Sequence, residues 1–420
     1  MFYLKAIAAA VVALAVWGAF VVFSTLNGWW HSPITSDSNP NSFMEAAKRV
    51  ISEQNVGNVA LVLIEGGAVY AEHFDAASQK IDRETIFPTA SMSKWITALG
   101  TMTLVESGDI DLDAPISRYL TRWQLPPSEF PHDGVTVGRL LSHTSGLSDG
   151  LGFGDYAAEE NVPSLEESLM NPRASSGRRV EIALGRTPGK EWDYSGGGYL
   201  ILQLIIEEVT GQSFEGYMQA AVLKPLGMSR STCGYIGEIT NTTISYDVEG
   251  APAPLYRYAA SAATGFSSSV ADMTKLVLAL LDTNDATPLR HTTVADMREP
   301  KATILGADVW GLGTILYAPT ATGDYVYGHD GQNEPALNAA VRINPVSHDA
   351  IIVFASGNPS LATHVGFEWV FWQTGLPDFL GIGYVIDRGV QTFAYGAIVI
   401  LSIIVLIGWK NRRSRALSVG

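Results

Sequence analysis

Residues 91–108 read SMSKWITALGTMTLVESG, and this stretch decides the fold expected for the chain. It follows the turn Phe87-Pro88-Thr89 and predicts an apolar helix over Ser91–Ser107. Ser91 and Lys94 are three residues apart, so they share one face of that helix. A serine hydroxyl becomes a nucleophile when a base lies beside it, and a buried lysine can serve as that base. The alternative is a serine that caps the helix and a lysine that extends to solvent.

Strand patterns lie on both sides of the region that this helix opens. Two β-rich runs flank Gly66-Gly67 and predict a hairpin. The middle of the chain, about 91–290, carries helical patterns, and the last third returns to strands. This order predicts an α+β fold in which both chain ends form one antiparallel five-stranded sheet, flanked by helices, with an inserted all-helical lobe. The expected strands lie at 58–64, 68–74, 311–317, 324–329, 336–343 and 350–355.

Composition excludes several classes of function. The chain has 420 residues, with 27 basic residues against 42 acidic ones, a net charge of −15. A nucleic-acid-binding protein needs clustered lysine and arginine to neutralise phosphates, so no nucleic-acid partner is expected. The single cysteine, Cys233, excludes an intrachain disulfide and a cysteine-cluster metal site.

Two apolar segments near the chain ends predict membrane helices. Ala6–Leu26 and residues 389–409 each give 21 residues without a charge, enough to cross a hydrocarbon core. The basic tail that follows residue 409 is expected in the cytoplasm. Two spans then place both termini in the cytoplasm and the region between them on the periplasmic or extracellular side. For the first segment, the alternative is a cleaved signal peptide.

The sequence therefore divides into three expected parts. Residues 1–30 are an N-terminal transmembrane anchor or signal sequence, 31–387 form the folded domain, and 388–420 form the C-terminal transmembrane helix and basic cytoplasmic tail. Six of the 27 basic residues lie in the two terminal parts, which leaves 21 against 42 acidic residues in the domain, a charge near −21. A charge of this sign keeps a domain soluble and away from anionic lipid.

Two further motifs can contribute chemistry. Glu191–Tyr199 reads EWDYSGGGY, and a tyrosine on such a glycine-rich turn can project its phenol into a cleft. The alternative is a core tyrosine at the start of a helix. Tyr327–Gln332 reads YGHDGQ after a strand, where glycine allows a substrate close to backbone N–H groups. Here the alternative is a bulge between strands.

In this order, Ser91-x-x-Lys94, Tyr194-Ser-Gly and His329-Asp-Gly resemble the serine β-lactamase-like and penicillin-binding protein family. The nearest branch is the class C β-lactamase-like group of esterases and D-amino-acid peptidases. The resemblance extends over about 45–375 and implies the same layout of sheet and helical lobe. The supporting phrases are Leu140–Leu147 (LLSHTSGL), Thr187-Pro188-Gly189 and Pro225–Met228 (PLGM).

The resemblance implies a role for each motif residue. Ser91 is the expected acyl-accepting nucleophile, Lys94 shares its proton, and Tyr194 completes the base and protonates the leaving group. The third motif and Gly196 are the expected substrate-binding elements, with the N–H groups of Ser91 and Gln332 forming an oxyanion hole. No cofactor and no metal ion are expected. The residues expected around substrate are His329, Asp330, Gly331, Gln332 and Gly196.

Two departures from the family pattern bear on the substrate. Many β-lactamases have Lys-Thr-Gly in the third motif, where this chain has His329-Asp330-Gly331. Many also have an asparagine two residues after the tyrosine, where this chain has Gly196. An acid at Asp330 is expected to repel a carboxylate-bearing substrate unless His329 is protonated. Both departures favour an esterase or peptidase over a true β-lactamase.

The sequence thus predicts a membrane-anchored serine hydrolase that cleaves an amide or ester of a small molecule or peptide outside the cytoplasm. The alternatives are a D-amino-acid prodrug-type peptidase, a D,D-carboxypeptidase, or a catalytically silent penicillin-binding or sensor domain. The oligomeric state stays open. His143 is expected to be a structural residue of a turn.

Overall fold

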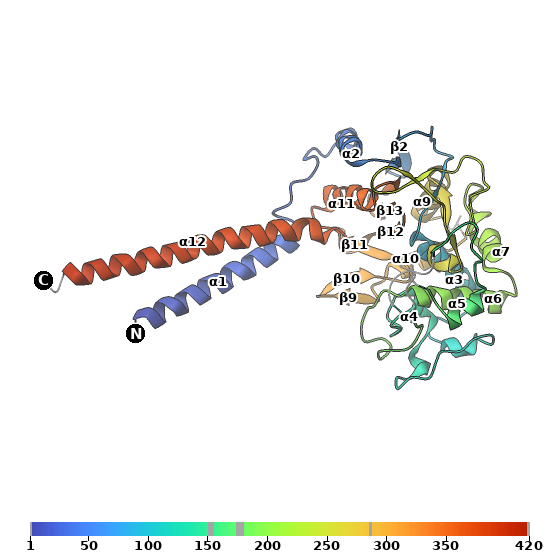
Figure 1. The fold of residues 1–420 in the computed structure, drawn as a ribbon, viewed down its shortest axis with the longest axis horizontal. Helices are drawn as coiled ribbons and strands as arrows, with labels where there is room; N and C mark the ends of the chain where they lie inside the picture. The colour runs from blue at the N-terminus through green and yellow to red at the C-terminus, as the bar shows by residue number, and fades with distance from the viewer. Residues whose placement is uncertain (1, 150–154, 174–179, 285–287, 418–420) are drawn as a thin grey trace.

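An antiparallel sheet of eight strands forms the centre of the molecule (Figure 1). The computed structural model describes residues 2–149, 155–173, 180–284 and 288–417. Strands from the N-terminal part pair with strands from the last third of the chain, as expected from the sequence. Their spatial order is β2 (Ala68–Ala76), β1 (Asn58–Glu65), β14 (Asp349–Ser356), β13 (Leu337–Asn344), β12 (Tyr325–Asn333), β11 (Ile315–Pro319), β10 (Ala307–Trp310) and β9 (Ala302–Ile304).

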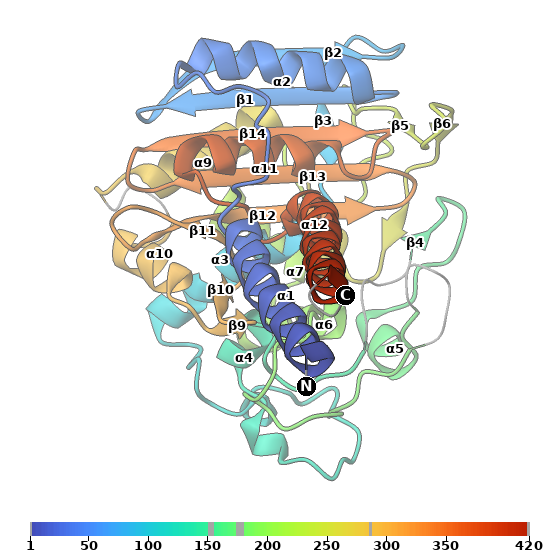
Figure 2. The ribbon, with the colours of Figure 1, turned by 90° about the vertical axis from the view of Figure 1, so that its left-hand side faces the viewer.

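Strand β1 shows why the sheet is covered on both faces. Successive side chains of a strand point to opposite faces. Ala60, Val62 and Ile64 pack into the core shared with the helical lobe, whereas Val59, Leu61 and Leu63 pack into a second core. Helices α2 (Pro40–Gln54) and α11 (Leu361–Thr374) cover this second face (Figure 2). A sheet buried on both faces explains the continuous apolar runs in β1 and β14.

The expectation of five strands is wrong, because the sheet has eight. The unexpected hairpin β9–β10 turns at Leu305 and Gly306, which both have positive φ angles, 51° and 86°. Its strands have only three and four residues, too few to show an alternating pattern. The lobe is also not entirely helical. It contains three short two-stranded ladders, β3 (Ile86–Pro88) with β8 (Ser267–Ser269), β4 (Asp155–Tyr156) with β7 (Arg257–Tyr258), and β5 (Ser245–Tyr246) with β6 (Pro252–Ala253).

The helical lobe packs around α3 (Met92–Ser107) and α6 (Gly196–Thr210), which are largely buried. Both helices end on a glycine in the left-handed conformation, Gly108 and Gly211, because a glycine adopts positive φ without strain. Its other helices are α4 (Val137–Leu141), α5 (Leu165–Met170), α7 (Phe214–Met218), the π-helix η3 (Gln219–Leu223), α8 (Ser261–Thr264), α9 (Val270–Leu281), α10 (His291–Arg298) and the 3₁₀ turns η1 (Ile116–Arg118) and η2 (His132–Gly134).

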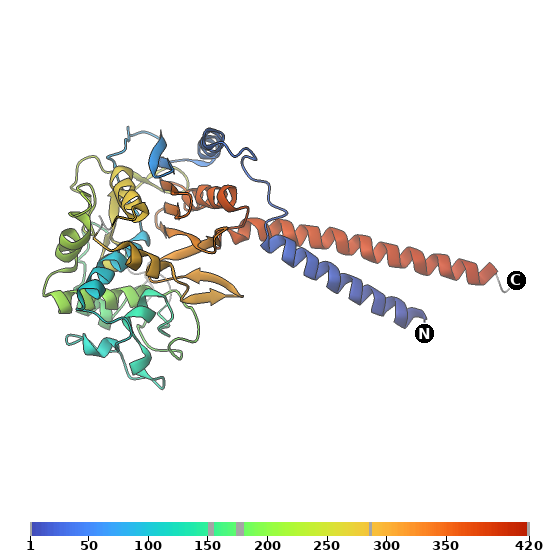
Figure 3. The same ribbon diagram turned by 180° about the vertical axis from the view of Figure 1, so that it is seen from behind.

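Two long helices, α1 (Phe2–Leu26) and α12 (Ile382–Leu417), project from the domain side by side, and both chain ends lie at their far end (Figures 1 and 3). Ala6–Leu26 and Ile382–Lys410 are long and apolar enough to be candidate membrane spans. The helices approach closely where α12 has glycine, since a methyl group at Gly396 would overlap the Trp17 indole. The indole N–H of Trp17 also donates to the Phe393 carbonyl, at 3.2 Å. Helix α12 begins six residues before Arg388, so its first turns belong to the domain surface.

Candidate active site

Ser91 stands at the N-terminus of α3, immediately after a strained residue. Ala90 has a φ of 50°, a conformation that costs free energy for any residue with a side chain. The Ser93 hydroxyl holds this turn, donating to the Ala90 carbonyl at 2.6 Å and accepting the Phe266 N–H at 2.8 Å. Ser91 makes no side-chain cap hydrogen bond and is partly exposed. Its hydroxyl is therefore available to a substrate.

Lys94 is the buried partner of Ser91. Lys94 is only 1% exposed, and its Nζ lies 3.3 Å from the Ser91 Oγ. Nζ also donates to the Ala263 carbonyl at 2.9 Å and lies 4.9 Å from the ring centre of Tyr194. The alternative of a capping serine and a lysine that extends to solvent is therefore wrong. The structure brings the three residues expected to be catalytic, Ser91, Lys94 and Tyr194, to one place.

A buried carboxylate, which the sequence reasoning missed, holds the second motif from beneath. Asp149 accepts the Ser195 hydroxyl at 2.5 Å and the Gly197 N–H at 2.6 Å. The same Ser195 hydroxyl caps α6 by accepting the Gly198 N–H at 2.8 Å. Burial raises the pKa of Asp149 to about 6, although these hydrogen bonds oppose the shift. Gly196 is buried in the first turn of α6, between the two residues that Asp149 binds.

His143 packs directly against Tyr194. The Ser195 N–H donates to its Nδ1 at 3.1 Å, and its ring centre is 4.4 Å from that of Tyr194. Burial, and then the positive charge of Lys94, lower the pKa of His143 far below its usual value, so the imidazole is neutral. The expectation of a structural turn residue fits these contacts, and the φ of 56° confirms a turn. The contact with Tyr194 was not foreseen, because the two residues are 51 positions apart.

Trp310 from the unexpected β10 completes the wall around Tyr194. Its ring centre lies 5.7 Å from Tyr194, 4.8 Å from His143 and 5.5 Å from His329. Its indole N–H donates to the Leu141 carbonyl at 3.2 Å. The tyrosine is therefore fixed by aromatic packing on several sides. Trp310 could not be predicted at this site, because the predicted sheet lacked the β9–β10 hairpin that carries it.

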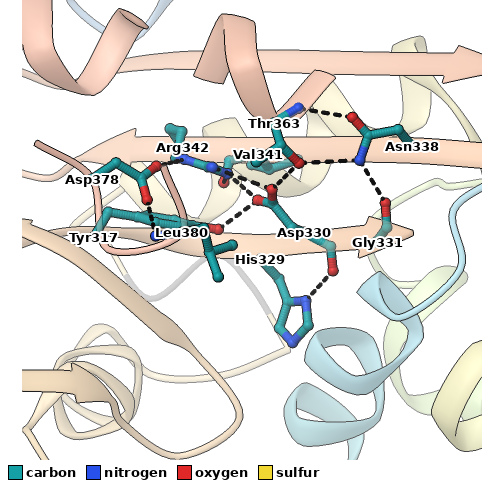
Figure 4. Close-up of polar contacts among 10 residues, drawn as sticks. All are labelled: Tyr317, His329, Asp330, Gly331, Asn338, Val341, Arg342, Thr363, Asp378 and Leu380. Atoms are coloured by element: carbon teal, nitrogen blue, oxygen red, sulfur yellow. Dashed lines mark hydrogen bonds and ion pairs between the residues drawn. The ribbon is translucent and has the colours of Figure 1, made fainter. Parts of the chain in front are cut away.

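The third motif lies on β12, where neighbouring residues face opposite sides (Figure 4). His329 points towards α3, and burial, with Lys94 opposing its charged form, lowers its pKa to about 3. Gly331 packs on the nucleophile's turn: a methyl group there would overlap the Thr89 carbonyl and lie 3.1 Å from the Ser91 nitrogen. Gln332 is exposed at the end of the strand. His329 and Gly331 therefore border the Ser91 region, whereas alternation along the strand places the Gln332 side chain on the opposite face, beside Thr363.

The structure does not place the fourth residue, the Asp330 carboxylate, at the substrate's edge. It lies on the other face of β12, where it accepts hydrogen bonds from Tyr317 at 2.9 Å and Thr363 at 2.6 Å (Figure 4). It also forms an ion pair with Arg342, which is completely buried. Alternation along the strand sends this side chain away from Ser91, so the expected repulsion of an anionic substrate has no basis here.

Arg342 extends the network to the start of the C-terminal helix. Its Nε lies 2.9 Å from the Asp378 carboxylate, which also accepts the Leu380 N–H at 2.7 Å (Figure 4). Burial disfavours the charged guanidinium, but Asp330 and Asp378 outweigh it and raise the pKa of Arg342 above its usual range. The positive charge of Arg342 is thus buried between two carboxylates, where β12, β13 and the segment before α12 meet.

A cavity of about 210 Å³ borders the end of the third motif. Two segments of the lobe, 233–236 and 254–258, line most of it, and Leu337 of β13 also contributes. Asn333, the last residue of β12, donates to the Tyr258 hydroxyl at 3.3 Å. Among the described residues, no group of three or more histidine, cysteine, aspartate or glutamate side chains could hold a metal ion.

Comparison with known proteins shows the family of the chain. The family model described as Beta-lactamase matches residues 42–366, more than three quarters of the chain. The chain belongs to the beta-lactamase family. Penicillin-binding protein 4* of Bacillus subtilis (strain 168) is 26% identical over 198 residues, 46% of this chain and 42% of that protein. Esterase EstB of Burkholderia gladioli is 30% identical over 222 residues, 48% of this chain and 52% of that protein. The matched part thus spans about half the length of these relatives.

Solved structures show the same beta-lactamase family fold. The octameric penicillin-binding protein homologue from Pyrococcus abyssi has a TM-score of 0.66 and 24% sequence identity, over 80% of this chain and 78% of that one. A penicillin-binding protein from Bacillus halodurans has a TM-score of 0.60 and 22% identity, over 76% and 96%. At these identities the similarity concerns the fold alone.

We expect Asp378→Asn to destabilise this member of the beta-lactamase family strongly. The change leaves Arg342 buried with one carboxylate, and breaking a buried ion pair costs about 3–5 kcal/mol. For a domain of this size we expect a melting temperature about 10 °C lower, measured on the full chain in detergent micelles. Asp133→Asn is the matched control, because Asp133 is exposed. Equal melting temperatures for both variants would contradict the proposed importance of the network.

We also expect the protein to lose stability as the pH falls from about 6.5 towards 3. In this interval an unfolded His329 binds a proton that the folded side chain, with its pKa lowered to about 3, does not bind. Between pH 7 and pH 4.5, the parent should lose about 5 °C more in melting temperature than His329→Gln. His348→Asn, at an exposed histidine, should behave like the parent. An identical pH response of parent and His329→Gln would show that His329 charges normally in the fold.

Proposed function

We propose that the chain is a membrane-anchored serine hydrolase that cleaves an amide or ester outside the cytoplasm through an acyl-enzyme on Ser91. The observation that carries the proposal is the buried Lys94 amino group, 3.3 Å from the Ser91 hydroxyl at the N-terminus of α3. A buried amine with so few partners is costly to keep unless it serves a function. Membership of the beta-lactamase family supports hydrolase chemistry at this pair.

In this proposal, acylation begins when Ser91 Oγ attacks the substrate carbonyl carbon. The hydroxyl proton passes to the Lys94 amine, Tyr194 gives its phenol proton to the leaving amine or alcohol, and Lys94 returns a proton to Tyr194. The carbonyl oxygen becomes negative and lies between the N–H groups of Ser91 and Gln332. The Ser91 N–H, which has no acceptor among the described residues, is free for this role. Water then attacks the Ser91 ester and restores the hydroxyl.

The third motif favours an esterase or peptidase over a β-lactamase. A lysine at position 329 would bring a positive charge to a substrate carboxylate, whereas His329 is neutral because its pKa is lowered to about 3. Gly196 brings no side-chain amide to the site. The substrate is then a small molecule or peptide recognised without a charged partner at position 329. A D-amino-acid prodrug-type peptidase and a D,D-carboxypeptidase both cleave amides, and each is an alternative within this proposal.

Ser91→Ala should abolish labelling of the full chain by a serine-directed fluorophosphonate and lower hydrolysis of activated esters about 10³-fold or more. The reason is that the Ser91 hydroxyl is the one that forms a hydrogen bond with Lys94. Ser107→Ala at the other end of α3 is the matched control, since Ser107 is exposed. Labelling that survives in Ser91→Ala would refute the nucleophile. Labelling of the parent without any turnover would instead identify a silent binding domain.

Orientation in the membrane can be tested with single cysteines, because the native Cys233 is buried. We expect Thr322→Cys, on an exposed turn of the domain, to react with a membrane-impermeant maleimide on intact cells. Ser414→Cys, in the basic tail, should react only after the cells are permeabilised. The reverse pattern would contradict the proposed orientation. A mature protein that lacks the first 30 residues would show that the N-terminal segment is a cleaved signal.

A further inference from the structure

The turn of the β9–β10 hairpin consists of apolar residues. It is formed by Ile304, Leu305, Gly306 and Ala307, and Ile304 pairs with Ala307 across it. Leu305 is completely exposed, at 105%, and Gly306 and Ala307 are exposed as well. Hairpin turns in water are normally built from glycine, asparagine, aspartate and serine. A run of exposed apolar residues without a charge is instead typical of a surface that meets an apolar partner.

The backbone of this turn makes a leucine an unusual choice. Leu305 and Gly306 have φ angles of 51° and 86°, so both central residues of the two-residue turn lie at positive φ. Asparagine, aspartate and glycine adopt this conformation easily, whereas the Cβ of a leucine makes it unfavourable. The turn therefore accepts backbone strain in order to place an apolar side chain at its tip. Such a choice favours a role for Leu305 in contact with a partner.

The hairpin faces the side of the domain from which the two long helices project. Figures 1 and 3 view the molecule from opposite sides, and in both the turn between β9 and β10 points in the direction of α1 and α12. Figure 2, turned by 90°, shows the two strands beside α1. Helix α1 ends at Leu26, and Trp29 just beyond it is 58% exposed. Since tryptophan at the end of an apolar helix is typical of the membrane–water interface, the hairpin turn faces that interface as well.

The charged residues that flank the turn are compatible with an apolar partner. Asp308, the first charged residue after the turn, accepts a hydrogen bond from the Tyr325 hydroxyl of β12 at 2.5 Å. Lys301, the last charged residue before the turn, precedes β9. A lysine close to a bilayer can extend its ammonium group to the lipid headgroups. The tip can thus enter an apolar layer without taking a charge into it.

We propose that the tip of this hairpin, residues 304–307, docks into the interfacial layer of the lipid bilayer that α1 and α12 span. The inference rests on the proposed membrane anchoring and is independent of the proposed hydrolase activity. Burial of the Ile304 and Leu305 side chains among the lipids removes apolar area from water. The domain then meets the bilayer at a third point besides the two helices. The same hairpin carries Trp310, whose ring centre lies 5.7 Å from that of Tyr194, so the docked strands also form part of the active-site wall.

The experiment measures the depth of the tip with the full chain in dioleoylphosphatidylcholine vesicles that contain a phosphatidylcholine with a nitroxide quencher near its headgroup. The reporter is Ala307→Cys labelled with a fluorescent maleimide, and the native Cys233 is buried. Gln212→Cys is the matched control, because it is exposed and precedes α7, on the opposite side of the domain from α1 and α12 (Figure 1). Ile398→Cys, at a residue of α12 that is 61% exposed, reports whether this helix lies in the bilayer.

We expect the quencher to lower the fluorescence of the Ala307 reporter about twofold, because apolar interfacial segments are buried about 5–10 Å in a membrane. The Gln212 reporter should keep its fluorescence. Leu305→Asp should restore most of the fluorescence of the Ala307 reporter, because a charged tip leaves the apolar layer. Aspartate tolerates positive φ, so this variant should keep the turn.

Two results would overturn the hairpin proposal and leave the membrane anchoring intact. One is an Ala307 reporter that behaves like the Gln212 reporter while the Ile398 reporter is quenched. The other is quenching of the Ala307 reporter that persists unchanged in Leu305→Asp. An Ile398 reporter without quenching would overturn the anchoring and the hairpin contact with it. None of these readings depends on ester turnover, so the hydrolase activity is tested separately by Ser91→Ala.

Discussion

The arrangement of the site depends on the ion pairs that the buried Arg342 guanidinium forms. A charge without access to water must be paired, and here its partners come from two distant parts of the chain, Asp330 of β12 and Asp378 before α12. The pairing therefore ties the position of β12 to the docking of the C-terminal segment. Because His329 and Gly331 lie on the same strand, their placement against α3 depends on a network that faces away from them.

A second buried charge, Lys94, stands on the opposite side of β12. Its only polar partners among the described residues are the Ser91 hydroxyl and the Ala263 carbonyl. The imidazoles around it are neutral, since burial lowers the pKa of both His143 and His329. Aromatic rings fill the remaining space. The site thus places the Lys94 amine and the Ser91 hydroxyl among neutral imidazole and aromatic rings, while the paired charges of Asp330, Arg342 and Asp378 lie on the other side of β12.

The sequence was enough to predict features that depend on local pattern. The apolar helix after Ser91, the strands at both chain ends and the two apolar terminal helices all follow from periodicity or length. It was not enough where short elements or distant contacts decide the outcome. The three- and four-residue strands of the β9–β10 hairpin carry no readable period, so Trp310 could not be foreseen. Asp149 was missed because its partners Ser195 and Gly197 lie 46 and 48 residues away in sequence. The prediction for Asp330 was wrong because alternation along β12 turns its carboxylate away from Ser91.

The missing asparagine after Tyr194 has a structural explanation in this chain. The turn that carries Tyr194 is held from beneath, where Asp149 binds Ser195 and the Gly197 N–H in a buried position. Its orientation is fixed again by the Ser195 N–H, which donates to His143. With these bonds in place, no side chain at Gly196 is needed to keep the tyrosine in position. The loss of an amide there changes what the site can recognise, while the buried partners of the neighbouring residues preserve the geometry of Ser91, Lys94 and Tyr194.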